Sequence, residues 1–422
     1  MPRVPRLPLV PDPLRRIRVP RDLDAVTAVG EEADPADAGM TRDSVEQIWR
    51  DAVTWYRSGV HPAMQVCVRR HGHVVLDRAI GHAHGNGPGD PPDATKVPVA
   101  TDTPFCVYSA SKAVTAFVVH VLIDRGLVGL HQPVADYIPG YGINRKHQIT
   151  VGHVLAHRAG VPNMPATAFD LDKMADREFI AGALVDAEPF AKPGSMLAYH
   201  AVSGGFILGE IAHQVTGKDI RAVLAEEILD PLGFRWTGYG VAEEDLDALG
   251  SDYVTGPALL PPASTLLTRA LGVSLDTIVE WSGDRRFRTA IVPAANVMTT
   301  AQELSRFFEI MRRGGELDGV RVMETETIQT ALTEQSHLEL DLSLGFPTRF
   351  GYGLMLGAQL LSLFGRDTQR AFGHLGFTNT LAWADPQRGT AVAILTSGKP
   401  TIYPEVWRFL GLSQRITGET TP

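Results

Sequence analysis

One serine and one lysine in this chain are spaced so that together they can carry out covalent catalysis. Ser109 and Lys112 stand in the segment TPFCVYSASKAVTAF, and the dense apolar residues after them predict a buried helix that ends near Gly126. Residues three apart lie on one face of a helix, so the amine can reach the hydroxyl. Burial favours neutral lysine, which can accept the serine proton and so activate the serine as a nucleophile. The serine N–H, at the helix start, has no partner within the helix and is free to stabilise an oxyanion.

The pair is unique in the chain because lysine is scarce. The 422 residues include 32 arginines and seven lysines, and Lys112 is the only lysine with a serine three residues before it. A guanidinium stays protonated, whereas a buried ammonium can lose its proton, so arginine could not serve at this position. The tetrapeptide by itself is equally consistent with a helix start that carries an exposed lysine.

Around this pair the sequence resembles the serine β-lactamase and penicillin-binding-protein superfamily. Within it, the chain is most similar to the class C-like branch and its family VIII carboxylesterases. The resemblance covers about residues 45 to 400, with blocks in the family's order: TPFCVYSASK, GLVGLHQPVADYIPGYG, ITVGHVLAHRAGVP, PGSMLAYHAVSGGFILGEIAHQVTGK, PAANVMTTAQELSRFF and GHLGFTNTLAWADPQRG. It implies an α/β fold of the β-lactamase/transpeptidase type, in which an antiparallel sheet is flanked by helices and a mainly helical domain is inserted.

The family's second catalytic element is Tyr-x-Asn, whose tyrosine relays a proton to the nucleophile and the leaving group. It corresponds to Tyr199-His200-Ala201, so the resemblance makes Tyr199 the third catalytic residue. Ala201 replaces the family's asparagine. Without the resemblance, Tyr199 is equally consistent with a core aromatic residue whose hydroxyl is satisfied locally.

The family's third element, Lys-Thr-Gly on the strand that edges the site, corresponds to His374-Leu375-Gly376. Gly376 would let the substrate approach the strand backbone, and the N–H of Phe377 would be the second oxyanion donor. In family members that recognise penicillin, the lysine and threonine of this element help to hold the substrate carboxylate. Leu375 has neither a charge nor a hydroxyl with which to do so. His374 could instead hold a proton near Tyr199 or hydrogen-bond an uncharged ester, or it could be a structural strand histidine.

These residues together predict a serine hydrolase that cleaves carboxylic esters through an acyl-enzyme intermediate and needs no cofactor. The alternatives are a β-lactamase or D,D-peptidase and an acyltransferase, each of which would use the same Ser109, Lys112 and Tyr199. A non-enzymatic binding protein is disfavoured because all three residues are present.

Composition along the chain predicts a discontinuous organisation. Residues 1–40 form a proline- and arginine-rich arm without a core of its own, either solvated or packed onto the body. Helix and hairpin patterns in 41–140 and strand patterns in 291–422 predict one α/β domain. The helical region 141–290 would be an inserted domain that forms one wall of the active site.

Composition and charge also limit the partners. Hydrophobic residues make up 44% and charged residues 21% of the chain, as in ordinary folded proteins. The formal net charge of −9 disfavours nucleic acid as a partner. We find no apolar run long enough for a secretory signal or a membrane span, so we expect a cytoplasmic protein acting on a small-molecule ester, and leave peripheral attachment to the envelope and the oligomeric state open.

The sequence lacks the motifs that an α/β-hydrolase or a zinc enzyme would need. There is no G-x-S-x-G pentapeptide, which an α/β-hydrolase would need. His153 and His157 have the spacing of a zinc pair, but Val154 stands where the H-E-x-x-H motif requires glutamate, so we expect helix-face histidines and no metal. Cys67 and Cys106 are expected to be buried, small apolar residues.

Overall fold

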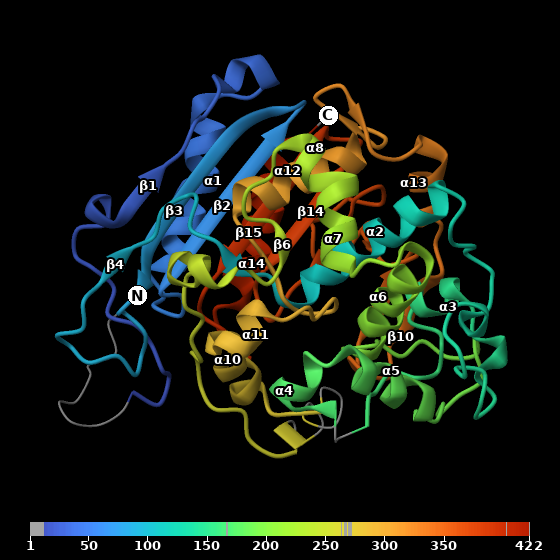
Figure 1. The fold of residues 1–422 in the computed structure, drawn as a ribbon. Coiled ribbons are helices and arrows are strands. Elements are labelled where there is room, and N and C mark those ends of the chain that lie inside the picture. Colours follow the sequence, from blue (N-terminus) through green and yellow to red (C-terminus); the bar gives the residue numbers. More distant parts are fainter. Residues whose placement is uncertain are drawn as a thin grey trace.

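The computed structural model describes residues 12–165, 168–262, 264–265, 268, 272–401 and 403–421, and its centre is one antiparallel sheet (Figure 1). The first long strand of the chain pairs with the last strand. Across the sheet the order is β1-β3-β2-β15-β14-β13-β12-β11-β10, and β4 pairs with β3. The strands are β1 (Thr27–Val29), β2 (Ala63–Arg70), β3 (His73–His84), β4 (Val97–Pro98), β10 (Ser336–Leu340), β11 (Pro347–Phe350), β12 (Met355–Leu356), β13 (Phe372–Leu375), β14 (Leu381–Asp385) and β15 (Thr390–Thr396).

The predicted hairpin around His71-Gly72 is confirmed as the connection between β2 and β3. Arg70 pairs with His73, so the loop has two residues. Both loop residues have positive φ, +50° at His71 and +92° at Gly72, which is what a type I′ turn requires. The turn sets the register that places the two strands beside the C-terminal strands.

Helices cover both faces of the sheet, and the alternation of side chains along β2 explains why. Met64, Val66 and Val68 belong to one core cluster, whereas Ala63 and Cys67 belong to the other. Successive strand residues point to opposite faces, so each face buries its own set. Cys67 and Cys106 are both buried, as predicted. The helices over the first cluster are α1 (Arg42–Tyr56) and α14 (Val406–Glu419), and the helix over the second is α12 (Ala301–Arg312).

Helix α2 (Ser111–Asp124) is the central helix of the second layer. Every residue from Ser111 to Leu122 is buried, as predicted from the dense apolar pattern. The helix contacts α6 (Ser203–Thr216) and β13, so it lies between the sheet and the helices of the middle segment. The start of α2 therefore lies where the sheet, β13 and the helices of the middle segment come together.

Between residues 141 and 290 the described part of the chain is mainly helical, and the short strand β6 (Gly238–Tyr239) joins β7 (Val297–Thr299) and β5 (Phe105–Cys106) in a small sheet. The division into an arm, a discontinuous domain and an inserted domain stays a prediction. Other helices are α3 (Val151–Leu155), α4 (Leu171–Met174), α5 (Arg177–Asp186), α7 (Ile220–Leu224), α8 (Asp230–Leu232), α10 (Leu275–Gly283), α11 (Arg285–Thr289) and α13 (Thr325–Ala331). The remaining elements are η1 (Asp24–Val26), η2 (Pro35–Ala38), η3 (Tyr108–Ala110), η4 (Val134–Asp136), η5 (Lys146–Gln148), η7 (Ala225–Leu229), η8 (Glu243–Ala248), β8 (Glu316–Leu317) and β9 (Val320–Arg321).

Part of the predicted arm lies against the body of the protein. Thr27 pairs with Ile80, which adds β1 to the edge of the sheet, and Ile17 is buried. Residues 1–11 of the arm lie outside the described residues. In the parts of the chain that the structure describes, no helix has both the length and the apolar character needed to cross a membrane.

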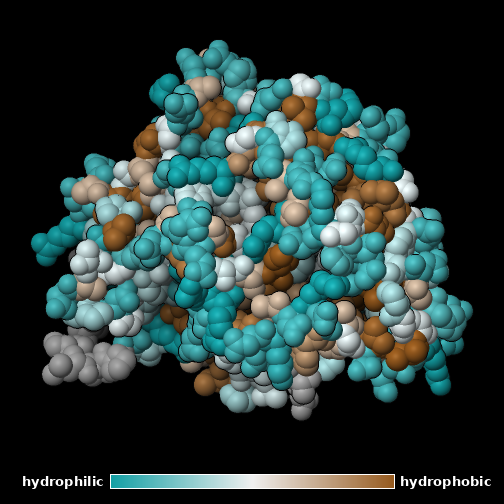
Figure 2. Space-filling view, in the orientation of Figure 1, coloured by the Kyte–Doolittle hydropathy of each residue, from teal (hydrophilic) through white to brown (hydrophobic). Residues whose placement is uncertain are grey.

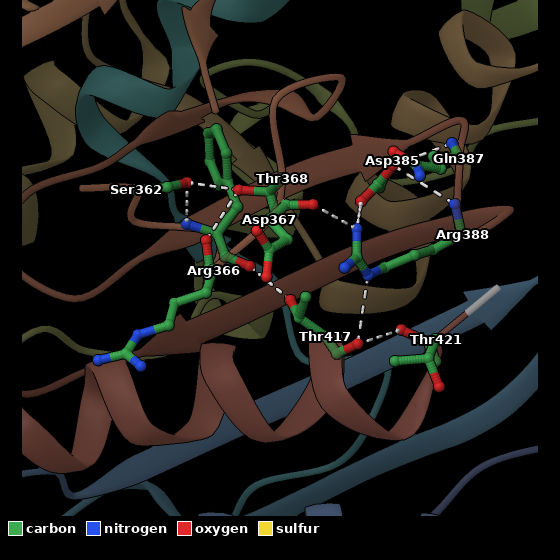
Figure 3. A network of polar contacts seen from close by, with 12 residues as sticks. Ser362, Arg366, Asp367, Thr368, Asp385, Gln387, Arg388, Thr417 and Thr421 are labelled. Atoms are coloured by element: carbon green, nitrogen blue, oxygen red, sulfur yellow. Dashed lines mark hydrogen bonds and ion pairs between the residues drawn. The ribbon is translucent and has the colours of Figure 1, made fainter. Parts of the chain in front are cut away.

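A buried polar network joins the turn between β14 and β15 to the end of α14 (Figure 3). The guanidinium of Arg388 pairs with the Asp385 carboxylate at 2.8 Å and donates to the carbonyls of Asp367 and Thr417 at 2.9 and 3.2 Å. Asp385 also accepts from the N–H of Gln387 at 2.9 Å. Both charged groups are buried and hydrogen-bonded, and the contact of Arg388 with the Thr417 carbonyl ties the C-terminal helix to the sheet.

Candidate active site

Ser109 lies in a tight turn at the start of α2. The chain leaves β5, passes through Tyr108 with a φ of +47°, and enters the helix after the short turn η3, in which the N–H of Ala110 donates to the Val107 carbonyl at 3.0 Å. A positive φ is uncommon for a bulky residue, and such strained residues are enriched at functional sites. The turn leaves Ser109 half-buried at the end of an otherwise buried helix.

Lys112 contacts the serine hydroxyl as the spacing predicted. Its Nζ lies 3.1 Å from the Oγ of Ser109 and donates to the Ala294 carbonyl at 3.0 Å. The same nitrogen lies 4.8 Å from the ring centroid of Tyr199. Burial lowers the pKa of Lys112 from 10.5 to about 7, because the charged form loses its hydration. A large fraction of the amine is therefore unprotonated near neutral pH and able to accept the serine proton.

Three contacts fix α2, and with it Lys112, to one short segment of chain. The Oγ of Ser111 accepts from the N–H of Val297 at 2.9 Å, and the hydroxyl of Thr115 donates to the Pro293 carbonyl at 2.6 Å. The Ala294 carbonyl lies between these two points and accepts from Lys112. The segment therefore holds the amine in place through a neutral carbonyl, which does not raise the lysine pKa as a carboxylate would.

Tyr199 completes the group of three. Its ring is buried, and burial raises its pKa above the usual range, although an interaction with the Ser109 side chain offsets part of the rise. The phenol is therefore a proton donor or relay near neutral pH rather than a phenolate. The backbone N–H of Tyr199 donates to the Oδ1 of Asp341 at 3.1 Å, and the same oxygen accepts from the N–H groups of Ser343 and Leu344 at 2.9 and 3.0 Å. Asp341, which the sequence did not point to, thus positions the tyrosine.

Three buried histidines surround Tyr199. The ring centroids of His157 and His374 lie 4.6 and 6.3 Å from that of Tyr199, and the Nδ1 of His157 accepts from the backbone N–H of His200 at 3.2 Å. Burial lowers the pKa of His200 and of His374 to about 3 and holds that of His157 well below its usual value. All three are neutral near pH 7, so none adds a positive charge beside Lys112.

His374 has a defined tautomer. Its Nδ1 lies 2.7 Å from the Leu375 carbonyl, which can only accept, so Nδ1 carries the proton. Its Nε2 is buried and has no hydrogen-bond partner among the described residues. His374 therefore offers a neutral acceptor near Tyr199 and not a cation.

His157 corrects a sequence-based expectation. We predicted helix-face histidines at 153 and 157, but α3 ends at Leu155 and the chain turns through a positive φ of +57° at His157. His153 caps the helix by exchanging hydrogen bonds with Thr150, whereas His157 turns inward and packs against Tyr199. The helix is shorter than the pattern indicates, so the two rings do not share a face.

The turn after β13 lies against the turn that carries the serine. A Cβ at Gly376 would come within 2.4 Å of the Val107 carbonyl, so only glycine allows this approach. The rings of Phe377 and Tyr108 lie 5.3 Å apart between centroids. Among the described residues, the N–H groups of Ser109 and Phe377 donate to no recorded hydrogen bond, so both are available to an oxyanion.

A second buried cluster lies directly behind the serine and was not foreseen. The hydroxyl of Tyr108 donates to Asp252 at 2.9 Å, and the other oxygen of Asp252 pairs with the Nζ of Lys399 at 3.3 Å. Lys399 also lies 4.8 Å from the Tyr108 ring centroid and 3.4 Å from the hydroxyl of Thr380, whose carbonyl accepts from Gly376. The cluster therefore links the serine turn to the Gly376 turn.

Lys112 is not the only one of the seven lysines that lies in the interior of the protein. Lys112, Lys146 and Lys399 are all buried, so Lys112 is not alone in occupying an interior site. Lys146 donates to three backbone carbonyls, and Lys399 pairs with Asp252. What distinguishes Lys112 is a neighbouring hydroxyl with no carboxylate paired to the amine.

Among the described residues, no group of three or more histidine, cysteine, aspartate or glutamate side chains is arranged to hold a metal ion.

Comparison with known proteins identifies the family of this chain. A family model described as Beta-lactamase matches residues 39–412. The chain is 32% identical over 342 residues to the esterase/beta-lactamase LipL of Mycobacterium tuberculosis, and the match covers 76% of each chain. A crystal structure of a penicillin-binding protein homologue from Caulobacter crescentus is similar with a TM-score of 0.76 and 25% identity, over 89% of this chain and 98% of that one. A family VIII carboxylesterase has a TM-score of 0.75 and 24% identity, over 88% and 97% of the two chains.

The structure has an antiparallel sheet flanked by helices, a serine and a lysine at the start of a buried helix, and a tyrosine beside them. These features define the class of active-site serine enzymes with the β-lactamase/transpeptidase-like fold. The predicted fold is therefore confirmed. Because the family model spans most of the sequence, the chain belongs to the beta-lactamase family and is an enzyme of that family.

Proposed function

We propose that this enzyme is a serine carboxylesterase that works through an acyl-enzyme. The observation that carries the proposal is the contact of 3.1 Å between Ser109 and Lys112, an amine whose pKa burial lowers to about 7. Transfer of the serine proton to Lys112 accompanies attack of Oγ on the ester carbonyl carbon. The N–H groups of Ser109 and Phe377 stabilise the oxyanion that forms.

Tyr199 moves the proton to the leaving group. Its raised pKa keeps the phenol protonated, and Lys112, beside its ring, can replace the proton that it gives to the departing alkoxide. Water then attacks the acyl-serine and returns a proton to Oγ through Tyr199, which releases the carboxylic acid. The balance is one ester and one water consumed for one acid and one alcohol formed, and no cofactor takes part.

The lining of the site supports an uncharged substrate. At the position where the family's lysine and threonine help to hold a carboxylate, this chain has a neutral His374 and the apolar Leu375. Lys399, the buried lysine nearest along the chain to that strand, is already paired with Asp252. A penicillin-like carboxylate thus finds no free cation among these residues, whereas an ester needs only hydrogen-bond donors and acceptors. The chain is also similar to a relative named an esterase/beta-lactamase, a name that includes both activities.

The test compares p-nitrophenyl esters of increasing acyl length with a chromogenic cephalosporin, using the purified protein and its Ser109→Ala variant. Esters should be turned over faster than the cephalosporin, and the variant should lose both activities. Unchanged ester hydrolysis in Ser109→Ala would contradict the mechanism, and a cephalosporin cleaved faster than every ester would favour the β-lactamase or D,D-peptidase alternative. Adding an alcohol acceptor tests the acyltransferase alternative, because transfer would then exceed hydrolysis.

A further inference from the structure

A large pocket lies among α4, α5, α6 and the start of α7, with the segment 289–293 as a further wall. Its volume is about 890 Å³, within the range of about 300–1,000 Å³ that is typical of small-molecule sites. In Figure 1, α5 and α6 lie towards the lower right, with α4 to the left of α5 and α7 above α6. The space-filling view in the same orientation shows hydrophobic residues between hydrophilic ones (Figure 2). Ser109, Lys112 and Tyr199 do not line the pocket.

One stretch of backbone separates this pocket from the catalytic lysine. Pro293 lines the pocket, and the next residue, Ala294, accepts from the Nζ of Lys112 on the catalytic side. Gly209 of α6 packs closely on the wall, since a Cβ there would lie 3.1 Å from the Pro293 ring. The pocket is therefore behind the wall that holds Lys112, and not an extension of the serine's immediate surroundings.

The lining combines apolar side chains with charged ones. Its apolar side chains include Leu171, Met174, Ile180, Phe206 and Ile291. Its charged side chains are four cations and three carboxylates: Arg177, Lys218, Arg221, Arg286, Asp172, Glu210 and Asp219. Lys218 and Arg286 also pair with Glu226 and Asp284, which lie outside the lining. The guanidinium of Arg221 donates only to backbone carbonyls, and no carboxylate among the described residues pairs with it, so it favours an anionic ligand locally.

Two polar groups in the lining have capacity left for a ligand. The Nη1 of Arg177 donates to both oxygens of the buried Glu210, at 2.9 and 3.0 Å, and its other guanidinium nitrogens donate to no recorded group among the described residues. The Nδ1 of His213 is shielded from solvent and has no partner among them. A guanidinium with free N–H groups is well shaped to bind a carboxylate.

We propose that this pocket is a second ligand site, which binds an aliphatic carboxylate of medium chain length. The chain lies on the apolar lining, and the carboxylate binds Arg177. The site goes beyond the proposed esterase activity and does not depend on it, because none of the catalytic side chains contributes to the pocket.

The experiment measures decanoate binding by titration calorimetry to the full chain, to three tryptophan variants and to Ser109→Ala. Ala181→Trp fills the pocket from α5, and Ala175→Trp fills it from the rim. Gly182→Trp is the matched control, because it places the same indole on the same helix where a Cβ meets nothing within 4 Å. Circular dichroism and turnover of p-nitrophenyl acetate show whether each variant is folded.

We expect one decanoate site, weakened at least about tenfold by Ala181→Trp or Ala175→Trp and unchanged by Gly182→Trp. Binding should persist in Ser109→Ala and after a phosphonate has blocked the serine, so the result does not depend on ester hydrolysis. Decan-1-ol should bind at least about tenfold more weakly than decanoate. Three outcomes would each overturn the proposal: loss of binding when the serine is blocked, equal binding by folded pocket-filling variants, or equal affinity for the alcohol.

Discussion

Replacing Lys112 by methionine should strongly reduce catalysis and, at neutral pH, make the protein more stable. A lysine pKa lowered from 10.5 to about 7 means that burying this side chain costs the folded state about 5 kcal/mol, at about 1.4 kcal/mol per pKa unit. Methionine fills a similar volume without that cost. It leaves the Ala294 carbonyl without its donor, which costs about 1–3 kcal/mol. The expected net gain at about pH 7 is therefore about 2–4 kcal/mol.

The gain should depend on pH with a definite sign. The destabilisation by Lys112 is fully present below its folded-state pKa of about 7 and fades as pH rises toward 10.5, where the unfolded chain also loses the lysine proton. The stability of the parent protein relative to the variant should therefore rise across this window. Near and above pH 10.5 only the lost hydrogen bonds remain, and the variant becomes the less stable protein by about 1–3 kcal/mol.

Urea unfolding, followed by intrinsic fluorescence at several pH values between 7 and 10.5, measures this difference. The matched control is Lys96→Met, at an exposed lysine, which should change the free energy of unfolding little at any of these pH values. Hydrolysis of p-nitrophenyl acetate by Lys112→Met should fall by about 10²–10⁴-fold, as for loss of a general base. A variant that is less stable than the parent by the same amount at every pH would show that the folded protein keeps Lys112 charged, and would refute the reasoning.

Four further outcomes follow from the same geometry. In the parent protein, kcat/KM for a non-titrating ester should rise with pH through about 7 and then level off, as Lys112 loses its proton; a profile that falls through this range would contradict its role as base. Tyr199→Phe keeps the buried ring but removes the relay, so steady-state assays should show kcat/KM lower by about 10²–10⁴-fold with little change in melting temperature. Tyr108→Phe removes the donor to Asp252; urea unfolding should show a loss of about 1–3 kcal/mol, and kcat should fall more than KM changes because the serine turn is less firmly held. Arg388→Met leaves the buried Asp385 unpaired and should cost about 3–5 kcal/mol in urea unfolding, while kcat per folded molecule stays as in the parent.

Local sequence patterns were sufficient for the features that depend on neighbouring residues. The spacing of Ser109 and Lys112 left an exposed lysine equally possible, but together with the dense apolar residues that follow it indicated two groups in contact on a buried helix, and the structure has both. The hairpin at His71-Gly72 is likewise decided by two adjacent residues that accept positive φ. Tyr199, His374, Gly376 and Phe377 could be named only through the family resemblance, because nothing in their local sequence marks them.

The residues that hold the site residues in place could not be predicted, because they are distant in sequence from the residues they contact. Asp341 holds the backbone of Tyr199 across 142 positions of chain. Asp252 reaches Tyr108 across 144 positions. No helical or strand period connects such residues. The local sequence around a single aspartate does not indicate which distant group will donate a hydrogen bond to it.

The sequence by itself determined that this chain carries one serine–lysine pair on a buried helix, and therefore what chemistry is available. Only the tertiary structure decided how that chemistry is tuned. It encloses Lys112 in apolar and neutral surroundings that lower its pKa to about 7, and it turns His157 and His374 inward as neutral rings beside Tyr199. A pKa depends on every group within several ångströms in space, and folding brings those groups together from all parts of the chain.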